Sequence, residues 1–321
     1  MTLRQLGQTT LQVTPLGMGC WPITGITSVD VNEDDSLATI REAFDAGINF
    51  FDTAYCYGFD GESEQMISRV LEYDRDKIVL ATKGGIHWVD GKQARCGRPE
   101  TLHRECDESL RRLNTDRIDL YYLHAPDPEV SIEESAGAIG ELIRQGSVLS
   151  AGLSNASTEQ LTRFHAVCPL TAYQPHFNML QREIEDSQLP WCVENGVATV
   201  VYWPLMKGLL AGHLPREHVF EAKDGRRKYP MFSGDEWQKN QDFLDVLRAM
   251  CVDLGRPISQ IVLNWTIQRT GITVALCGAK RPHQIRENAE AMSWSLTAVE
   301  IDRIDRAIAA RGPIISKAAV S

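Results

Sequence analysis

The chain has 321 residues, of which 43% are hydrophobic and 24% charged, and its formal net charge is −10 at pH 7. This length suits one large α/β domain, so we expect a single domain over residues 1–321. The acidic balance without a basic stripe argues against nucleic-acid binding, and no apolar run approaches the ~18 residues of a membrane span.

The first predicted element is a β-hairpin made by residues 3–7 and 11–13, with a turn at residues 7–10. Short apolar runs then alternate with amphipathic stretches to the end of the chain, which is typical of repeated βα units around a parallel sheet. The expected strands are 16–19, 48–52, 78–82, 120–124, 148–153, 172–174, 199–202 and 273–276. We expect the initial hairpin to plug the N-terminal end of the barrel that these strands form.

The stretches between these strands carry apolar residues at intervals of three and four, which predicts helices. The clearest are 35–46, 62–71, 99–113, 132–145, 158–167 and 258–268. Further helices are expected at 235–254, 282–291 and 297–310. Residues 84–98 and 207–235 are too long for simple connections, and we expect these loops to carry specificity.

Polar side chains follow three of the predicted strands. Asp52, Lys83 and His124 each stand at the end of an apolar run, and Tyr57 lies in the loop after Asp52. The carboxyl ends of barrel strands converge on one pocket, so these residues are expected to meet. Each taken singly could be a helix cap, a strand end, a packed ring or a core histidine, but their joint placement favours a catalytic site.

The combination has a chemical logic. A tyrosine donates a proton near neutral pH when a neighbouring ammonium stabilises its phenolate, and a carboxylate keeps that ammonium charged. We therefore expect Tyr57 to be the proton donor, with its pKa lowered by Lys83. Asp52 would hold Lys83 charged, and a neutral His124 would orient a carbonyl.

These residues resemble the catalytic tetrad of the aldo-keto reductases. The family's Asp-Thr-Ala-x-x-Tyr-Gly motif is matched at residues 52–58, followed by the strand-borne Lys83 and His124. Further matches are Gly152-Leu153-Ser154-Asn155, Gln174, Tyr202-x-Pro204-Leu205, and Gly278-Ala279-Lys280-Arg281 followed by Glu287-Asn288. The resemblance implies a (β/α)8 TIM barrel with an N-terminal hairpin plug and extra C-terminal helices, which transfers hydride with a nicotinamide cofactor and uses no metal.

The resemblance also implies a cofactor site. Ser154, Asn155 and Gln174 would bind the carboxamide, and Tyr202 would stack on the nicotinamide. Backbone groups of Leu205, Lys207, Gly208 and Leu209 would hold the diphosphate. The adenosine end is matched by Gly278, Lys280, Arg281, Gln284, Glu287 and Asn288. The charges of Lys280 and Arg281 favour a 2′-phosphate and so NADP(H), although NAD(H) stays possible.

Two positions near the expected cofactor depart from the family pattern. Trp203 stands where a small residue is common, and Cys277 replaces the usual proline before Gly278. Aromatic residues after strand ends are candidates to line the substrate pocket, above all Trp21 and Trp88, with His87 and Trp203 less favoured.

The chain has 8 cysteines without a CxxC pair or a metal-type spacing, so we expect free thiols and a cytoplasmic location. Cys56, Cys20 and Cys277 could make activity sensitive to oxidants, but burial as small hydrophobic residues is the favoured reading.

The leading hypothesis is an NADP(H)-dependent oxidoreductase that acts on an aldehyde, ketone or sugar-like carbonyl, with Tyr57 as general acid and base. The alternatives are an NAD(P)-dependent sugar or alcohol dehydrogenase working in the oxidative direction, and a cofactor-binding regulatory subunit of a membrane channel. The expected partner is a small-molecule carbonyl or sugar substrate. The oligomeric state is left open.

Overall fold

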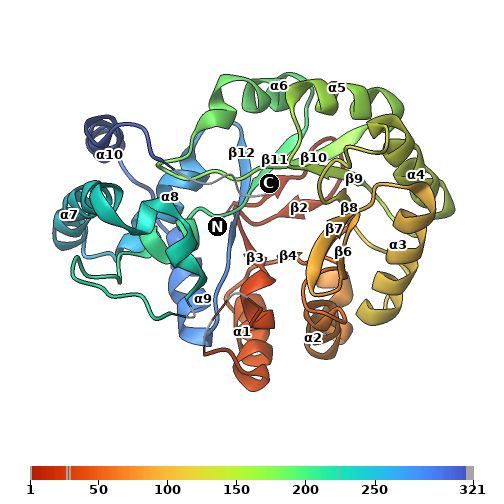
Figure 1. Ribbon diagram of the computed structural model, residues 1–321, viewed down its shortest axis with the longest axis horizontal. Coiled ribbons are helices and arrows are strands. Elements are labelled where there is room, and N and C mark those ends of the chain that lie inside the picture. Colours follow the sequence, from red (N-terminus) through yellow and green to blue (C-terminus); the bar gives the residue numbers. More distant parts are fainter. Residues whose placement is uncertain (1, 27, 29, 223, 316–321) are drawn as a thin grey trace.

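Among residues 2–26, 28, 30–222 and 224–315, which the computed structural model describes, eight parallel strands close into a barrel (Figure 1). In spatial order the strands are β3 (Leu16–Gly19), β4 (Phe50–Asp52), β5 (Val79–Gly84), β8 (Leu120–Leu123), β9 (Ala151–Ser154), β10 (Leu170–Gln174), β11 (Ala198–Val201) and β12 (Ile272–Cys277). Pairing of β12 with β3 closes the ring, with Cys277 opposite Met18. The predicted (β/α)8 barrel is confirmed.

Strand residues alternate between two hydrophobic layers, as the twofold period of a strand requires. On β4, Phe50 belongs to the cluster inside the barrel and Phe51 to the cluster between the strands and the helices. On β8, Leu120 and Tyr122 point inward, whereas Tyr121 and Leu123 contact the outer layer. The same alternation determines which polar side chains at the strand ends point into the barrel.

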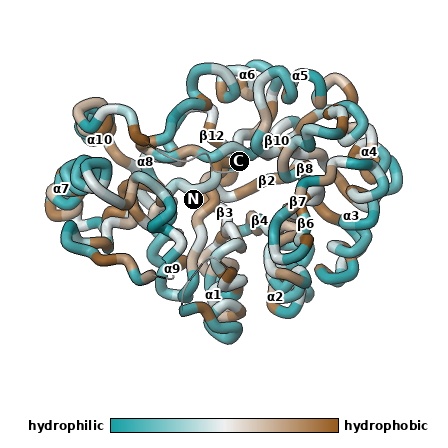
Figure 2. Tube along the Cα trace, viewed as in Figure 1, coloured by the Kyte–Doolittle hydropathy of each residue, from teal (hydrophilic) through white to brown (hydrophobic). Residues whose placement is uncertain are grey.

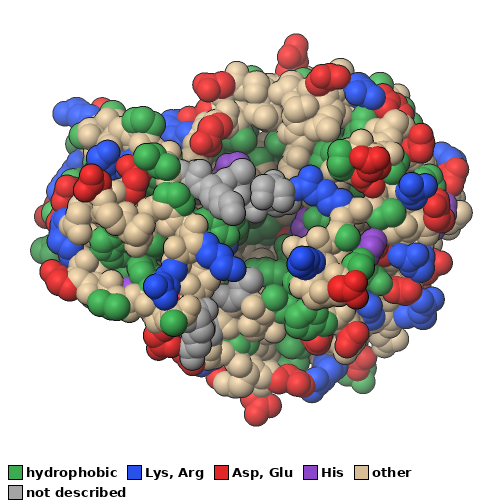
Figure 3. Space-filling model, in the orientation of Figure 1, with side chains coloured by type: hydrophobic (Ala, Val, Ile, Leu, Met, Phe, Trp, Pro, Cys, Tyr) green, Lys and Arg blue, Asp and Glu red, His purple; other side chains and the backbone are tan. Residues whose placement is uncertain are grey.

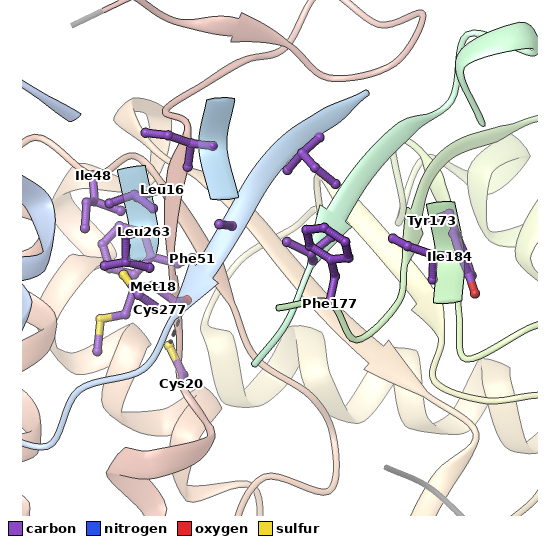
Figure 4. Packing of buried hydrophobic residues seen from close by; sticks show 14 of the residues in the cluster. Leu16, Met18, Cys20, Ile48, Phe51, Tyr173, Phe177, Ile184, Leu263 and Cys277 are labelled. Atoms are coloured by element: carbon purple, nitrogen blue, oxygen red, sulfur yellow. Dashed lines mark hydrogen bonds between the residues drawn. The ribbon is translucent and has the colours of Figure 1, made fainter. Parts of the chain in front are cut away.

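The outer layer is formed by helices packed around the barrel. They are α1 (Glu33–Asp45), α2 (Glu62–Leu71), α3 (Pro99–Leu113), α4 (Ile132–Gln145), α5 (Thr158–Val167), α6 (Gln188–Glu194), α7 (Gly234–Leu254), α8 (Ile258–Gln268), α9 (Pro282–Ala289) and α10 (Ala298–Arg311). Figure 2 shows hydrophilic residues along much of their outward surface. Figure 4 shows the side chains of Leu16, Met18, Phe51 and Leu263 packed together in the buried layer.

The predicted N-terminal hairpin is present as β1 (Arg4–Gln5) and β2 (Gln12–Val13). Leu6 and Val13 are fully buried and belong to the same cluster as the barrel interior. The Arg4 guanidinium donates to the carbonyl oxygens of Ile267, Ile272 and Thr273, which ties the hairpin to the N-terminal end of β12. The hairpin therefore closes that end of the barrel, as expected.

The extra C-terminal helix is fixed to α7 by a buried charge. Arg311 at the end of α10 donates to Glu236 at 2.5 Å and to the side-chain oxygen of Asn240 at 2.9 Å. Only 1% of the Arg311 side chain is exposed, so removing Glu236 would leave a buried, partly unpaired cation.

Two elements differ from the sequence-based expectation. Residues 84–98, expected as a loop, contain an antiparallel hairpin of β6 (Ile86–Val89) and β7 (Lys92–Arg95). Its turn is made by Asp90 and Gly91 with φ of 49° and 73°, which is the left-handed pair that a two-residue hairpin turn requires. The short helix α6 was not predicted. No helix in the described ranges is long and apolar enough to cross a membrane.

Candidate active site

Six polar residues continue the inward register of their strands beyond the apolar interior. Asp52 follows Phe50 by two positions, Lys83 follows Ala81, and His124 follows Tyr122, and each of the earlier residues lies in the inner cluster. The same spacing of two residues applies on three further strands. It brings Ser154 inward on β9, Gln174 inward on β10 and Tyr202 inward just after β11. The barrel thus brings these side chains together at its carboxyl end, where TIM-barrel active sites lie.

An ion pair lies at the base of this site. The Lys83 ammonium is 2.6 Å from one carboxylate oxygen of Asp52 and also donates to the Thr53 carbonyl oxygen at 2.8 Å. The second Asp52 oxygen accepts from the Gln174 amide nitrogen at 2.7 Å. Burial raises the pKa of Asp52, whereas Lys83 and Gln174 act in the opposite direction. Both carboxylate oxygens therefore have donors, which is the condition for keeping a buried pair ionised.

Tyr57 lies directly above this pair. Its hydroxyl accepts from the Lys83 ammonium at 3.4 Å, and that ammonium is 4.9 Å from the centre of the Tyr57 ring. Asp52 and Lys83 are about 1% exposed, whereas Tyr57 and His124 are only partly buried. The residues expected to contact substrate are thus the accessible members of the group.

The expectation that the Tyr57 pKa is lowered is wrong. Burial raises this pKa well above its ordinary value, and the negative charge of Asp52 raises it further. The ammonium is paired with Asp52, and its charge does not outweigh the effect of burial on the hydroxyl. Tyr57 is consequently a neutral phenol that retains its proton.

His124 is held by its backbone and by its ring. Its N–H donates to the Gly84 carbonyl at 2.9 Å, and its carbonyl accepts from the Asn155 amide at 3.1 Å. The ring packs edge-on against Tyr57 with centroids 5.8 Å apart. Burial, and secondarily Lys83, lowers the pKa of His124 well below its ordinary value, which favours the neutral ring.

A belt of hydrogen bonds connects the residues proposed to bind the carboxamide. The Ser154 hydroxyl donates to the Gln174 carbonyl at 2.7 Å, and the Asn155 amide donates to the Ser154 oxygen at 3.1 Å. The Tyr202 hydroxyl donates to the Asn155 side-chain oxygen at 2.7 Å. These hydrogen bonds hold the side chains of Ser154, Asn155 and Tyr202 in place. The Gln174 side-chain amide donates to Asp52.

The segment after β11 contains three consecutive residues with a left-handed backbone. Met206, Lys207 and Gly208 have φ of 46°, 54° and 87°. The N–H groups of Met206 and Gly208 donate to the carbonyl oxygens of Trp203 and Leu205, each at 2.8 Å, so these two donors are engaged within the turn itself. The expected diphosphate position, Leu205 to Leu209, coincides with this segment.

Lys207 adds a cation to this segment. Its ammonium lies 4.0 Å from the ring centre of Trp203 and 4.8 Å from that of Tyr229. Within the part of the chain that the structure describes, no carboxylate lies within 4.0 Å of it. Burial lowers the pKa of Lys207 to about 8. A half-buried cation that has no acidic partner among the described residues fits an anionic ligand such as a diphosphate.

The residues predicted for the adenosine end lie before and within α9. The Lys280 backbone N–H donates to the Gln284 side chain at 2.9 Å, and Glu287 accepts from the Ser259 hydroxyl at 2.8 Å. Arg281 is 3.1 Å from the Asp35 carboxylate, so its charge is partly neutralised. Asn288 is buried, and Gly278 is in close contact with Pro22, which a Cβ at Gly278 would approach to 2.5 Å.

Aromatic side chains flank the catalytic group. The Trp21 ring lies 5.0 Å from that of Tyr57, edge-on. The Trp88 indole N–H donates to the Cys56 carbonyl at 3.0 Å, and its ring lies 4.8 Å from that of Phe59. Figure 3 shows that this face of the molecule is hollowed near its centre, with charges of both signs around it. Trp21 thus lies beside the Tyr57 ring, and Trp88 is fixed to the backbone directly before Tyr57.

A residue that the sequence reasoning missed holds the β6–β7 hairpin. The fully buried Glu105 on α3 accepts from the Gly85 N–H at 2.6 Å, and its other oxygen is 2.9 Å from the His87 ring nitrogen. The His87 side chain, which was a candidate to line the substrate pocket, therefore contacts Glu105 and helps to hold the hairpin. The available signal was a glutamate on the apolar face of the predicted helix at 99–113.

The comparisons with known proteins agree with this geometry. The profile of the Aldo/keto reductase family matches residues 15–309. The chain belongs to the aldo/keto reductase family. Aldo-keto reductase YhdN of Bacillus subtilis (strain 168) is 35% identical over 301 residues, which cover 93% of this chain and 91% of the relative. Probable aldo-keto reductase 1 of Glycine max is 32% identical over 308 residues, with 95% and 88% covered.

Solved aldo-keto reductase structures have the same barrel. The glycerol dehydrogenase AKR11B4 from Gluconobacter oxydans superposes with a TM-score of 0.90 at 32% identity, covering 97% of this chain and 96% of the other. The aldo-keto reductase AKR11C1 from Bacillus halodurans, in its holo form, gives a TM-score of 0.79 at 28% identity, covering 100% and 98%. As a member of this family the protein is an oxidoreductase that acts on small-molecule carbonyl substrates with a nicotinamide cofactor.

Proposed function

We propose that this aldo/keto reductase is NADP(H)-dependent and transfers hydride between nicotinamide and an aldehyde, ketone or sugar-like carbonyl, with Tyr57 as general acid and base. The observation that carries the proposal is the position of the Tyr57 hydroxyl, 3.4 Å from an ammonium that Asp52 fixes at 2.6 Å. A protonated phenol next to a fixed cation is suited to neutralise an alkoxide.

Each catalytic residue has a separate task. When bound, the cofactor supplies or accepts the hydride. Tyr57 gives its proton to the developing alkoxide oxygen, or removes the proton of an alcohol in the opposite direction. Lys83 places positive charge beside that oxygen, and neutral His124 donates a hydrogen bond that orients it.

The residues around the site fit an anionic nucleotide. The Lys207 ammonium suits the diphosphate, and the belt of Ser154, Asn155 and Tyr202 suits the carboxamide end. Lys280 and Arg281 support NADP(H). Because Arg281 already contacts Asp35, we expect the preference over NAD(H) to be moderate.

The oxidative alternative has a specific argument in its favour. The high structural similarity to a glycerol dehydrogenase, at a TM-score of 0.90, supports a sugar or alcohol dehydrogenase. Initial rates with aldehydes and NADPH, set against rates with aldoses or polyols and NADP⁺ or NAD⁺, separate the two directions. Nucleotide binding without turnover of any of these compounds would instead support the regulatory subunit.

The cofactor preference is tested by titration. Quenching of tryptophan fluorescence by NADPH and NADH, measured in parallel, should give tighter binding for NADPH. Arg281→Ala should reduce that difference, and equal affinities in the parent protein would overturn the NADP(H) assignment. The predicted cytoplasmic location is tested separately by cell fractionation.

A further inference from the structure

Cys56 contacts the catalytic histidine through its side chain. It lies between β4 and α2, directly before Tyr57, and only 1% of it is exposed. Its sulfur is 3.6 Å from Nδ1 of His124, which is within the range of a hydrogen bond that involves sulfur. Cys56 and His124 are 68 residues apart in the sequence, and the barrel brings them together.

The opposite side of the sulfur has a partner of defined polarity. The Gln93 side-chain amide nitrogen donates to Cys56 Sγ at 3.6 Å. An amide N–H can only donate, so the sulfur is the acceptor in this contact. The thiol hydrogen is left to point toward His124 Nδ1.

The thiol keeps its hydrogen at neutral pH. Burial raises the pKa of Cys56 to about 12, so the side chain is present as S–H and not as a thiolate. The imidazole is neutral as well, and its protonation is opposed by burial and by the charges of Lys83 and Arg95. A neutral imidazole carries one hydrogen, so the ring must adopt one of two tautomers.

We propose that Cys56 is a positioning residue that fixes the tautomer of His124. Its S–H donates to Nδ1, and the imidazole hydrogen is therefore on Nε2, where it serves as the donor to the substrate oxygen. The reverse tautomer would place a hydrogen on Nδ1 and leave a lone pair on Nε2, which repels a carbonyl oxygen. The role of Nε2–H as a donor to substrate rests on the proposed function. The assignment of the His124 tautomer does not.

The β6–β7 hairpin supports Cys56 from two directions. Gln93 on β7 contacts the sulfur, and Trp88 on β6 donates to the Cys56 carbonyl at 3.0 Å. Glu105 in turn fixes the start of the hairpin at Gly85 and His87. The β6–β7 hairpin is thus connected to the hydrogen bonding of His124 through Cys56.

The first test reads the tautomer directly. Nitrogen-15 NMR of histidine-labelled, ligand-free protein distinguishes Nε2–H from Nδ1–H, and His124→Gln assigns the signal. We expect Nε2–H in the parent protein and a mixture of tautomers, or Nδ1–H, in Cys56→Ala. Cys56→Ser keeps a hydroxyl donor and should retain mainly Nε2–H. Cys106→Ala, which truncates a cysteine buried on α3, is the matched control and should leave the signal unchanged.

The second test reads catalysis. Cys56→Ala should lower kcat for carbonyl reduction by about 10-fold, a part of the usual general acid–base contribution, with the cofactor Kd unchanged and partial recovery in Cys56→Ser. A pure Nε2–H signal with unchanged kcat in Cys56→Ala would overturn the proposal. If Cys56→Ala does not fold, Gln93→Glu replaces it, because the carboxylate accepts the thiol hydrogen and should also shift His124 toward Nδ1–H.

The two proposals fail in different ways. A parent protein with the Nε2–H signal that reduces no carbonyl would sink the proposed function and leave the tautomer assignment standing. A parent protein that turns over aldehydes but shows Nδ1–H at His124 would overturn the Cys56 proposal alone.

Discussion

The ammonium of Lys83 lies 3.4 Å from the hydroxyl of Tyr57 and donates a hydrogen bond to it. This contact joins a buried ion pair to a partly exposed phenol, so charge that is fixed inside the barrel acts at the surface of the pocket. Its geometry follows from the inward register of β4 and β5, where Asp52 is paired with Ala81, two residues before Lys83.

Replacing the ammonium should damage both catalysis and folding. Lys83→Met should reduce kcat by at least about 100-fold, because the positive field at the reacting oxygen is lost. It also leaves Asp52 buried without its cation, which should cost ~3–5 kcal/mol of unfolding free energy. Steady-state rates and urea unfolding measure the two effects. A stable Lys83→Met enzyme with near-normal kcat would contradict the assigned role.

The Lys207 ammonium should make cofactor affinity depend on pH. In the free protein its pKa is about 8, and binding of an anionic cofactor stabilises the charged form and so raises this pKa. Affinity should therefore be full below pH 8 and decrease as the pH rises above that value. Lys207→Met should bind the cofactor more weakly and lose the step near pH 8. A step of the same size in Lys207→Met would assign it to another group.

Gly152 should be intolerant of a side chain. A Cβ at this position would lie 2.2 Å from Cδ1 of the Tyr122 ring, inside the barrel. Gly152→Ala should therefore lose ~1–3 kcal/mol of stability from overpacking. The matched control is Gly137→Ala on α4, where no described heavy atom lies within 4 Å of the new Cβ. That change should gain ~0.5–1 kcal/mol, and equal urea midpoints for the two variants would refute the packing argument.

Glu105 should control the hairpin and not the chemistry. In Glu105→Gln one oxygen becomes a donor, so the Gly85 N–H and the His87 ring can no longer both have an acceptor with the present geometry. Hydrogen exchange in β6 and β7 should become faster, and KM for bulky carbonyl substrates should change more than kcat for small ones. Unchanged exchange in this hairpin would show that Glu105 is not its anchor.

Much of the fold was predictable because local and long-range signals agree. The bounds of α2, α3, α4 and α5 match the expected ranges, since amphipathic periodicity and capping residues such as Ser157 point to the same ends. The meeting of the candidate catalytic residues at one end of the barrel was predictable for a related reason. The twofold period of a strand carries Phe50 to Asp52 and Ala81 to Lys83, so a polar residue that ends an apolar run lies at the barrel mouth.

What was missed depends on three-dimensional packing or on weak local signals. The β6–β7 hairpin has an Asp90-Gly91 turn, but β7 is too polar to form an apolar run. Helix α6 has only 7 residues and contains Pro190. The direction of the Tyr57 pKa shift depends on how far the folded protein excludes water from the Tyr57 hydroxyl. The contact of Cys56 with His124 exists only once the barrel closes.

The central claim is tested most directly by Tyr57→Phe, with turnover and cofactor binding measured on the same preparation. This change removes the hydroxyl and keeps the ring that packs against Trp21 and His124. We predict that kcat falls by at least about 100-fold while the NADPH dissociation constant stays within about twofold, because the proton donor alone is lost. Near-normal turnover in Tyr57→Phe would contradict the account.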